Sequence, residues 1–442
     1  MRKLLAILLC KIGHRIGGLF GRGSSLPGKY ALKICPDILS RVRMPEYSIG
    51  VSGSNGKTST VEMMREMLEK AGLSVACNYE GSNQIEGVTT MILDNCTLFG
   101  RFRKDVLLME IDERYAKYIF HWFSPKYFVI NNLYRDQMTR NGHPEYVMKD
   151  IRKAIPEGST LVLNADDPLI ASLGEEFANE TVYFGIEDNP YVSKTPTSVY
   201  NDGYYCPVCK QKMVYDYCHF GHVGKYHCTS CDFERPAPAY AITDIDMEKG
   251  EIVINDRCHV SLALHAIHNA YNVLAAFTVG SLMGLKDETM ADSLNNYLIR
   301  NGRVRRFKTG GRTGTLLISK HENTTSYDNN LQYICSQNRD VQLLLIIDDI
   351  SRKYFTSDTS WLWDIRFDLL KNEKVKEVVV AGKYTDDVAV RLENAGVDMD
   401  KVFLTRYTAD ALTHLQENVD GELFVMTCFS DEGKLLKEVE VL

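Results

Sequence analysis

The chain has 442 residues, of which 45% are apolar and 25% charged, a balance typical of globular proteins that excludes fibrous and disordered classes. Its length predicts two or three domains. The formal net charge of −7 argues against a protein that grips nucleic-acid phosphates, so no nucleic acid is expected as a partner. The 12 cysteines belong to a chain long enough to rely on its own core, which favours a reducing, cytoplasmic setting over a disulfide framework.

The N-terminal segment is rich in leucine and isoleucine and predicts a helix with an apolar face. Its run Leu4–Cys10 is shorter than the roughly 20 residues that span a bilayer, and no small-residue cleavage site follows it. Two interpretations stay open: a helix packed on its own domain, and a helix resting on an anionic membrane surface. Residues 24–36 predict a loop and linker, which makes 1–44 an N-terminal helix and linker.

Apolar segments alternate with helical ones from residue 45 onward, the pattern of a parallel sheet covered by helices. The pattern breaks near residue 200, resumes near 237, and begins again after residue 303. The sequence therefore predicts an α/β chain with a central domain over 45–302, an insert at about 200–236, and a smaller Rossmann-like domain over 303–442. The expected strands are 47–53, 105–111, 126–133, 160–166 and 181–186, then 341–349, 377–382, 401–405 and 422–430.

A glycine-rich turn over 50–60 follows the first of these strands and opens a helix that stops at Gly72. Glycines let the backbone curl so that its N–H groups face a phosphate, and the helix N-terminus adds positive potential. The strict G-x-x-x-x-G-K-[ST] pattern is not met, because Val51 occupies its first glycine, but the shorter G-x-x-G-K-T-S is present. The alternative is an ordinary glycine turn. The predicted nucleotide-binding residues are Gly53, Asn55, Gly56, Lys57, Thr58 and Ser59, with Lys57 reaching the β and γ phosphates.

Carboxylates end the strand at 105–111, where Glu110 and Asp112 share one face. A buried strand that brings carboxylates beside a phosphate loop is typical of Mg²⁺ sites, since this ion prefers oxygen ligands. We therefore predict Glu110 and the Thr58 hydroxyl as magnesium ligands. The alternative for Glu110 is a solvated strand end.

Two Cys-x-x-Cys pairs in the insert match a four-cysteine zinc ribbon: Cys206, Cys209, Cys228 and Cys231. Four thiolates fill the tetrahedral shell of zinc, so the expected metal is structural and leaves no position for catalysis. Further donors in the insert are expected as surface residues, namely Cys218, His219, His222 and His227.

The segments 53–60, 163–168 and 268–276 (GSNGKTST, LNADDP and HNAYNVLAA) together resemble the Mur ligase family, ATP-dependent enzymes that build peptidoglycan stem peptides. The resemblance implies a Mur-ligase-type P-loop ATPase domain that uses ATP and Mg²⁺. It also implies that Asn269 contacts the adenine and that Arg303 faces the nucleotide.

Several departures from the family point to one of its branches. Gln137 stands where a histidine is usual, 321–330 (HENTTSYDNN) replaces a D-x-A-H-x-P segment, and the usual N-terminal domain for a UDP-linked substrate is missing. Together with the cysteine insert, the segments 24–34 and 356–364 resemble the Mur-ligase-like subunits of lipid II isoglutaminyl synthase. That branch amidates the D-glutamate α-carboxyl of lipid II through an acyl phosphate. It works as a heterodimer with a GatD-type glutaminase subunit that releases ammonia. Whether the chain also contacts the inner membrane surface peripherally stays open.

None of the cysteines lies in a G-x-C-x-G elbow, so a second chain must carry the glutaminase nucleophile. The resemblance implies that the C-terminal domain lends an aspartate to the partner's Cys–His pair. Asp358 is the predicted residue and Asp349 the runner-up; alternatively, Asp358 only caps the helix expected near Trp361. Two other functions stay open. One is a Mur or folylpolyglutamate-type ligase that adds an amino acid without a partner. The other is a zinc-ribbon scaffold or nucleic-acid-binding ATPase.

Overall fold

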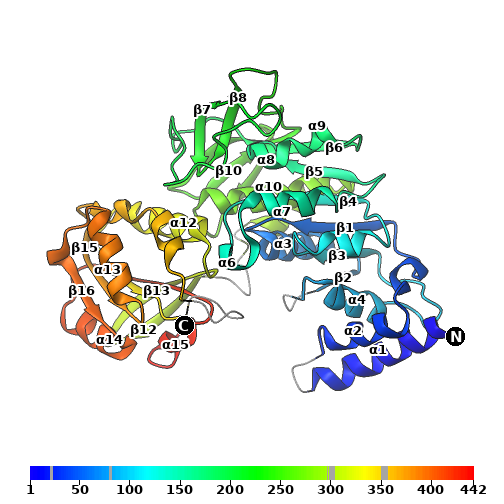
Figure 1. Ribbon diagram of the computed structural model, residues 1–442, viewed down its shortest axis with the longest axis horizontal. Coiled ribbons are helices and arrows are strands. Elements are labelled where there is room, and N and C mark those ends of the chain that lie inside the picture. The colour runs from blue at the N-terminus through cyan, green and yellow to red at the C-terminus, as the bar shows by residue number, and fades with distance from the viewer. Residues whose placement is uncertain (20–22, 79–81, 296, 298–303, 350–356) are drawn as a thin grey trace. The chain divides into compact units, whose positions relative to one another are not determined.

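A computed structural model describes residues 1–19, 23–78, 82–295, 297, 304–349 and 357–442 (Figure 1). The chain divides into two compact α/β units. The first comprises Met1–Leu133, Glu145–Thr195 and Gly203–Ile299, and the second Tyr134–Pro144, Pro196–Asp202 and Arg300–Leu442. The second unit thus takes two short segments from the middle of the chain, which lie inside the range that the sequence assigns to the central domain.

The first unit is built on a nine-stranded sheet. Seven neighbouring strands of this sheet, from β2 at one edge to β9, run parallel to one another. Strands β3 and β4 are buried at every position, as expected for parallel strands covered on both faces. In spatial order the strands are β11 (Cys258–Ser261), β10 (Glu251–Ile254), β9 (Tyr240–Asp246), β6 (Thr181–Ile186), β5 (Thr160–Asn164), β4 (Tyr127–Ile130), β1 (Tyr47–Ser52), β3 (Val106–Glu110) and β2 (Val75–Cys77).

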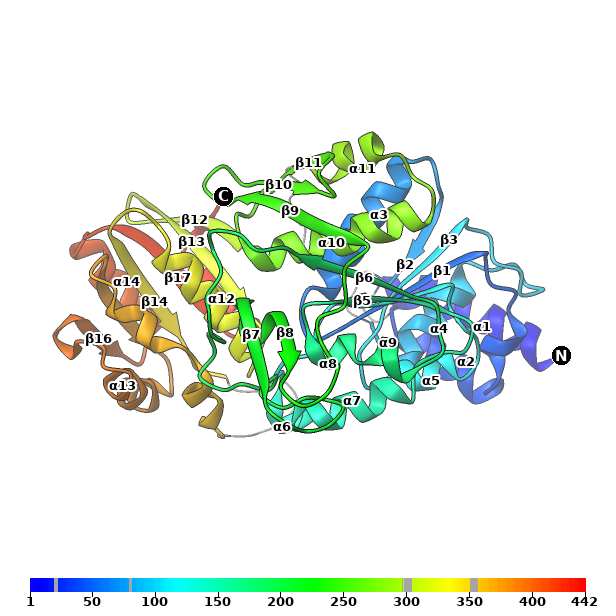
Figure 2. The ribbon, with the colours of Figure 1, turned by 90° about the horizontal axis from the view of Figure 1, so that it is seen from above.

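Helices cover both faces of this sheet, as Figure 2 shows. One face carries α3 (Lys57–Lys70), α10 (Ile267–Leu282) and α11 (Asp287–Leu294). Helix α10 is apolar all round and buried from Asn269 to Gly280, so it belongs to the core. The other face carries α1 (Arg2–Gly18), α2 (Leu26–Ile34), η1 (Ile38–Arg41), α4 (Ile85–Asp94), α5 (Ala116–Phe120), α7 (Pro144–Arg152), α8 (Pro168–Ala171) and α9 (Leu173–Glu176). A separate hairpin of β7 (Met213–Phe220) and β8 (Val223–Cys228) lies in the insert.

The second unit has a seven-stranded sheet with a parallel centre. Its strands in spatial order are β16 (Val402–Thr405), β15 (Val375–Ala381), β14 (Val341–Ile346), β17 (Glu422–Cys428), β13 (Arg312–Ser319), β12 (Val304–Thr309) and β18 (Glu440–Val441). One face packs on α12 (Thr324–Cys335), η2 (Ser360–Asp364), η3 (Phe367–Lys371) and α13 (Thr385–Asn394). The other packs on α14 (Thr408–Glu417) and α15 (Glu432–Leu436), while α6 (Met138–Asn141) and η4 (Met399–Lys401) are short additions.

The prediction of a loop over 24–36 was wrong, because this segment contains helix α2. Pro27 lies in the first turn, where its fixed φ suits a helix and its missing N–H costs nothing. Gly28 lets α2 approach α4 closely: a Cβ there would lie 2.0 Å from the Glu86 carbonyl oxygen, and its N–H donates to Thr90 Oγ1 at 2.8 Å. The Pro-Gly pair that resembles a turn signal therefore serves helix packing.

Helix α1 packs on α2 and α4 through Ala6, Ile7 and Cys10, which are buried. The buried side of α1 therefore agrees with the first interpretation of the N-terminal segment, a helix packed on its own domain. Among the helices that the structure describes, none combines the length and the apolar run needed to cross a membrane.

Candidate functional site

The glycine-rich loop joins the end of β1 to the start of α3, with β1 held between β3 and β4. Gly53 and Gly56 have φ of +132° and +82°, a region that side-chain-bearing residues rarely adopt. Predicted residues Gly53, Asn55 and Gly56 lie in this loop, and Lys57 begins the 14-residue helix. Thr58 and Ser59 occupy its first turn. A tight turn at the N-terminus of a helix suits a phosphate group.

Two asparagines that the sequence analysis missed hold the loop in place. They follow β4, the strand beside β1. The Asn132 Oδ1 accepts from the Asn55 N–H at 2.8 Å, and its Nδ2 donates to the Asn55 carbonyl at 3.1 Å. The Asn131 Nδ2 donates to the Thr60 Oγ1 at 2.9 Å. Polar residues directly after a buried parallel strand were the available signal for them, since strand ends meet at one edge of a sheet.

Asn272 of α10 is a third residue that the motif did not reveal. Its Oδ1 accepts from Thr60 Oγ1 at 3.4 Å, and a Cβ on Gly56 would lie 2.1 Å from the same oxygen. The side chain of Asn272 thus occupies the space that any residue larger than glycine at position 56 would need.

We expect Gly56→Ala to weaken ATP binding about thirtyfold, because overpacking at such a contact costs about 2 kcal/mol. The measurement is the Kd for ATP by titration calorimetry. Gly72→Ala is the matched control, since Gly72 has φ +85° but nothing within 4 Å of its Cβ position. Equal losses in the two variants would assign the effect to backbone strain and would contradict the role of the Asn272 contact.

Lys57 is buried against the loop that precedes it. Its Nζ lies 3.0 Å from Glu113 Oε2 and donates to the Gly53 carbonyl, and the two charged side chains are only 8% and 4% exposed. A buried, paired ammonium at the start of the helix is positioned for a phosphate oxygen. Glu113 follows the strand that ends at Glu110 and was not among the predicted site residues.

The predicted magnesium ligand Glu110 ends β3 directly beside the loop strand, where it pairs in register with Val51 of β1. Its side chain is buried, and its Oε1 accepts from Asn83 Nδ2 at 3.1 Å. Asn78 fixes the backbone at this point by bonding both the N–H and the carbonyl of Glu110. Asn83 thus orients the carboxylate, and Asn78 fixes the backbone that carries it. Magnesium prefers oxygen ligands, so Glu110 stays the predicted ligand together with the Thr58 hydroxyl.

The resemblance also implies that Asn269 contacts the adenine and that Arg303 faces the nucleotide. Asn269 is buried in the first turn of α10, and its Nδ2 donates to the Leu264 carbonyl at 3.3 Å. Arg303 lies outside the described residues.

The four predicted zinc cysteines come together in the insert. The sulfurs of Cys206, Cys209, Cys228 and Cys231 all lie within 4.8 Å of one another, and Cys206 Sγ is 3.7 Å from Cys231 Sγ. Four thiolates at about 2.3 Å around a tetrahedral zinc would be about 3.8 Å apart, so this set fits the metal. The Cys209 N–H at 3.5 Å from Cys206 Sγ, and the Ser230 N–H at 3.4 Å from Cys228 Sγ, are placed to stabilise thiolates.

The hairpin of the insert packs on the segment that follows β5, which includes the LNADDP motif. Tyr226 donates to the Ala165 carbonyl, and the Gly224 N–H donates to the Asp166 carbonyl, both at 2.9 Å. The Asp166 side chain is fully buried, with Oδ1 2.5 Å from Arg235 Nε and Oδ2 2.5 Å from the Tyr271 hydroxyl. The insert is therefore joined to the edge of the sheet that carries the nucleotide motifs.

Three of the four further donors in the insert are buried, so the prediction that they are surface residues was wrong for these three. Cys218, His219 and His222 are buried because the hairpin turns this side toward the sheet, whereas His227 is exposed. Burial lowers the pKa of His219, whose Nε2 lies 3.0 Å from the Ile186 carbonyl. Because a carbonyl only accepts, His219 is a neutral ring protonated at Nε2 that serves packing.

In the second unit, Asp358 is exposed immediately before η2. Its Oδ1 accepts from the Ser360 N–H at 2.9 Å, and hydrogen bonds from Ser360 hold its pKa below the usual range. The carboxylate thus stabilises a turn, and the helix expected near Trp361 is a short 3-10 helix whose N-cap is Thr359. Asp358 is a charged, accessible carboxylate on an ordered turn.

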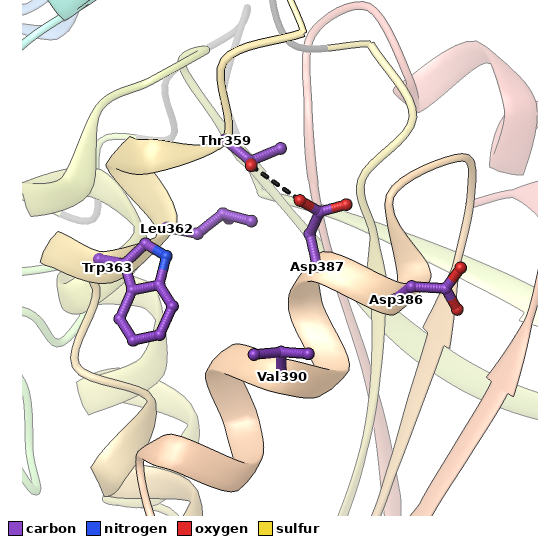
Figure 3. A pocket seen from close by; sticks show the side chains of 6 residues that line it. All are labelled: Thr359, Leu362, Trp363, Asp386, Asp387 and Val390. Carbon is purple, nitrogen blue, oxygen red and sulfur yellow. Dashed lines mark hydrogen bonds between the residues drawn. The ribbon is translucent and has the colours of Figure 1, made fainter.

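A pocket of about 320 Å³ lies next to this turn (Figure 3). Leu362 and Trp363 form one side of it and Val390 the other, and Trp363 and Val390 are 49% and 50% exposed. Thr359 Oγ1 donates to Asp387 Oδ1 at 2.8 Å across the rim. The surface beside Asp358 therefore combines exposed apolar side chains with carboxylates.

The runner-up Asp349 lies in a different environment. Its N–H donates to the buried Asp431 carboxylate at 3.0 Å, and its Oδ2 is 3.9 Å from Lys434 Nζ. Lys434 also pairs with Asp431 at 2.9 Å. Asp349 is thus part of a local charge cluster with a lysine.

The two segments that depart from the Mur ligase pattern meet in the second unit. The Gln137 N–H donates to the Glu322 carbonyl at 3.1 Å, and both residues have positive φ, at +50° and +49°. Thr139 donates to both Glu322 carboxylate oxygens at 2.7 Å, and burial raises the pKa of Glu322. Non-glycine residues with such φ need firm support and are often functional. Sequence spacing gave no sign that these positions are neighbours.

Two family models match the chain. The Mur ligase middle domain matches residues 51–230, and the MurT ligase C-terminal domain matches residues 321–431. The MurT subunit of lipid II isoglutaminyl synthase (glutamine-hydrolyzing) from Staphylococcus aureus strain COL is 30% identical over 404 residues, covering 90% of this chain and 89% of the relative. The subunit of the same name from Streptococcus pneumoniae strain R6 is 26% identical over 441 residues, covering 97% and 95%.

A solved structure is similar over most of the chain. The pseudomurein peptide ligase type C from Methanothermus fervidus superposes with a TM-score of 0.70 at 19% identity, covering 91% of this chain and 80% of that chain. At this identity the likeness concerns the fold alone. It confirms the expected α/β architecture of the Mur ligase type.

Proposed function

The chain belongs to the family of MurT subunits of lipid II isoglutaminyl synthase, and we propose that it amidates the D-glutamate α-carboxyl of the lipid II stem peptide. It is an ATP-dependent ligase whose substrate is lipid-linked. Ammonia comes from a GatD-type glutaminase subunit in a heterodimer. The products are the D-isoglutamine form of the stem, ADP and phosphate.

The observation that carries the proposal is the loop between β1 and α3. A buried lysine, two glycines with positive φ and a helix N-terminus make a phosphate site, and Glu110 ends the strand beside it. A carboxylate resists attack by ammonia until it carries a leaving group, and phosphoryl transfer supplies one. The geometry thus supports the phosphoryl transfer that a ligase of this kind needs.

The residues predicted for the nucleotide and for the magnesium ion act in this step. Bound Mg-ATP supplies the phosphoryl group that converts the carboxylate to an acyl phosphate. Lys57 neutralises negative charge on the phosphates, and Glu110 and Thr58 hold the magnesium ion. Asn269 contacts the adenine, while the role that the resemblance implies for Arg303 concerns a residue outside the described part of the chain. Ammonia then forms the C–N bond and loses a proton as the C–O bond to phosphate breaks.

The second unit serves the partner subunit. Asp358 orients the histidine of the partner's Cys–His pair, as the third member of a triad does. Its exposure and its low pKa support this role, since the group must be charged and reachable by another chain. The exposed apolar pocket beside it supports a protein contact at this surface. The four-cysteine cluster holds a structural zinc ion.

The proposal is tested by incubating the chain with lipid II, Mg-ATP and an ammonium salt, and by reading the stem peptide with mass spectrometry. We expect an acid-to-amide mass change at D-glutamate with ammonium alone, and with glutamine only when the glutaminase subunit is added. Omission of ATP is the control. ATP consumption that depends on an added amino acid, with no amide formed, would contradict the proposal and favour a ligase that acts without a partner.

A further inference from the structure

Helix α1 has a second apolar face, opposite the one that packs on α2 and α4. Each residue of a helix advances by about 100°, so the residues of this face share one arc of the helix surface. They are between 42% and 55% exposed: Leu4, Leu5, Leu8, Leu9, Ile12 and Ile16. We call this set the α1 face. A helix on the surface of a globular protein normally presents polar side chains there, so an exposed face of six large aliphatic residues needs a partner.

The apolar surface continues beyond α1. Leu19 is 82% exposed at the end of the helix, and Leu26 and Tyr30 of α2 are 42% and 56% exposed. In Figure 1, α1 is the lowest of the three helices, with α4 between it and the strands of the first unit. The α1 face therefore looks away from the sheet that carries the phosphate loop.

The charged residues of the segment that forms this surface have one sign. Residues 1–36 contain seven lysines and arginines and no aspartate or glutamate, whereas the whole chain has a net charge of −7. Arg2 and Arg15 of α1 and Lys29 and Lys33 of α2 are exposed. Lys3 and Lys11 instead donate to backbone carbonyls of their own unit, at Arg41 and Asp94.

We propose that the α1 face docks on an anionic phospholipid membrane, lying in the plane of its surface. The aliphatic side chains enter the boundary of the acyl region, and the basic residues contact the headgroups. A helix with an apolar outer face, basic flanks and no acidic residue matches an anionic membrane surface in both hydrophobicity and charge. A protein partner would require only the apolar side chains of the α1 face. It would not explain why the first 36 residues contain no aspartate or glutamate. The inference stands on α1 and α2, whatever reaction the phosphate loop serves.

Vesicle co-sedimentation of the full-length chain tests this proposal. We expect binding to vesicles of phosphatidylcholine mixed with phosphatidylglycerol, much weaker binding to phosphatidylcholine alone, and a decrease with added salt. Leu8→Glu combined with Ile12→Glu should lower binding at least about tenfold, because both changes put charge into the apolar boundary. Arg2→Glu combined with Arg15→Glu should lower binding about tenfold and weaken its salt dependence.

Folding and specificity have their own controls. Leu8 and Ile12 are exposed, so the double variant should keep the melting temperature and the ATP affinity of the unaltered chain. Tyr146→Glu on α7 replaces another exposed apolar residue, at 62% exposure, and should leave vesicle binding unchanged. Equal binding to neutral and anionic vesicles would refute the role of the charges. If the unaltered chain ignores vesicles, or forms a dimer that Leu8→Glu with Ile12→Glu dissociates, the membrane proposal is wrong and the α1 face is a protein interface.

Discussion

Lys57→Ala is expected to lower amidation by about 10²–10³-fold with either nitrogen source, since removing one preorganised charge from the reacting group costs that much. The loss should appear in kcat, measured as ADP release with lipid II and ammonium at saturating ATP. Lys70→Ala is the matched control, because Lys70 ends the same helix and is exposed. Its kcat should not change.

The ion pair with Glu113 makes a stability control necessary. Removing Lys57 leaves a carboxylate that is 4% exposed without its cation, which costs about 3–5 kcal/mol. The double variant Lys57→Met with Glu113→Gln removes both charges and should regain most of the lost melting temperature. It should remain inactive. Recovery of activity along with stability would show that the lysine serves only the fold of the loop.

Asp358→Asn is expected to separate the two nitrogen sources. Glutamine-driven amidation with the glutaminase subunit should fall by about 10³-fold or more, the loss seen when an amide replaces a triad carboxylate. Ammonium-driven amidation should keep its rate, because Asp358 lies in the second unit and takes no part in activating the carboxylate. The measurement is the initial rate of stem-peptide amidation with each donor at equal ATP.

Asp349→Asn distinguishes the predicted residue from its runner-up. Asp349 lies 3.9 Å from Lys434 in a local cluster, so its replacement should leave both rates near those of the unaltered chain. Glutamine-driven loss confined to Asp349→Asn would transfer the role to that residue. Equal loss with both donors in Asp358→Asn would instead make Asp358 a structural residue whose bond to the Ser360 N–H supports the turn.

Local signals in the sequence were sufficient for nine of the sheet strands and for the phosphate loop, whereas β2, β9 to β13 and β18 were not predicted. Parallel strands buried on both faces are continuous apolar runs, so 105–111 predicted β3. The apolar run 181–186 predicted β6 with the bounds that the structure has. A loop of glycines followed by lysine and threonine needs particular φ values, and the structure has them at Gly53 and Gly56. The cysteine spacing likewise predicted a cluster that the four sulfurs form.

Local sequence signals did not predict contacts between segments that are distant in the chain. Asn272 meets the loop across 212 residues from Thr60, and no local pattern marks an asparagine in an apolar helix as a neighbour of a glycine. The same holds for Gln137 and Glu322, which the sequence places in different domains. Helix α2 was missed because a proline and a glycine have the same local signature in a turn as in the first turn of a closely packed helix.

The buried carboxylate of Asp166 has a consequence for the order of folding. Its partners Arg235 and Tyr271 follow it by 69 and 105 residues, and one belongs to the region after the cysteine hairpin. A growing chain releases β1 to β5 long before these groups exist, and an ionised carboxylate resists burial without them. The edge of the sheet at β5 and β6 therefore closes only after the hairpin and α10 have been synthesised. A chain that stops before residue 271 lacks the Tyr271 partner of this carboxylate, so we expect it to leave the sheet open at β5 and β6 and to aggregate.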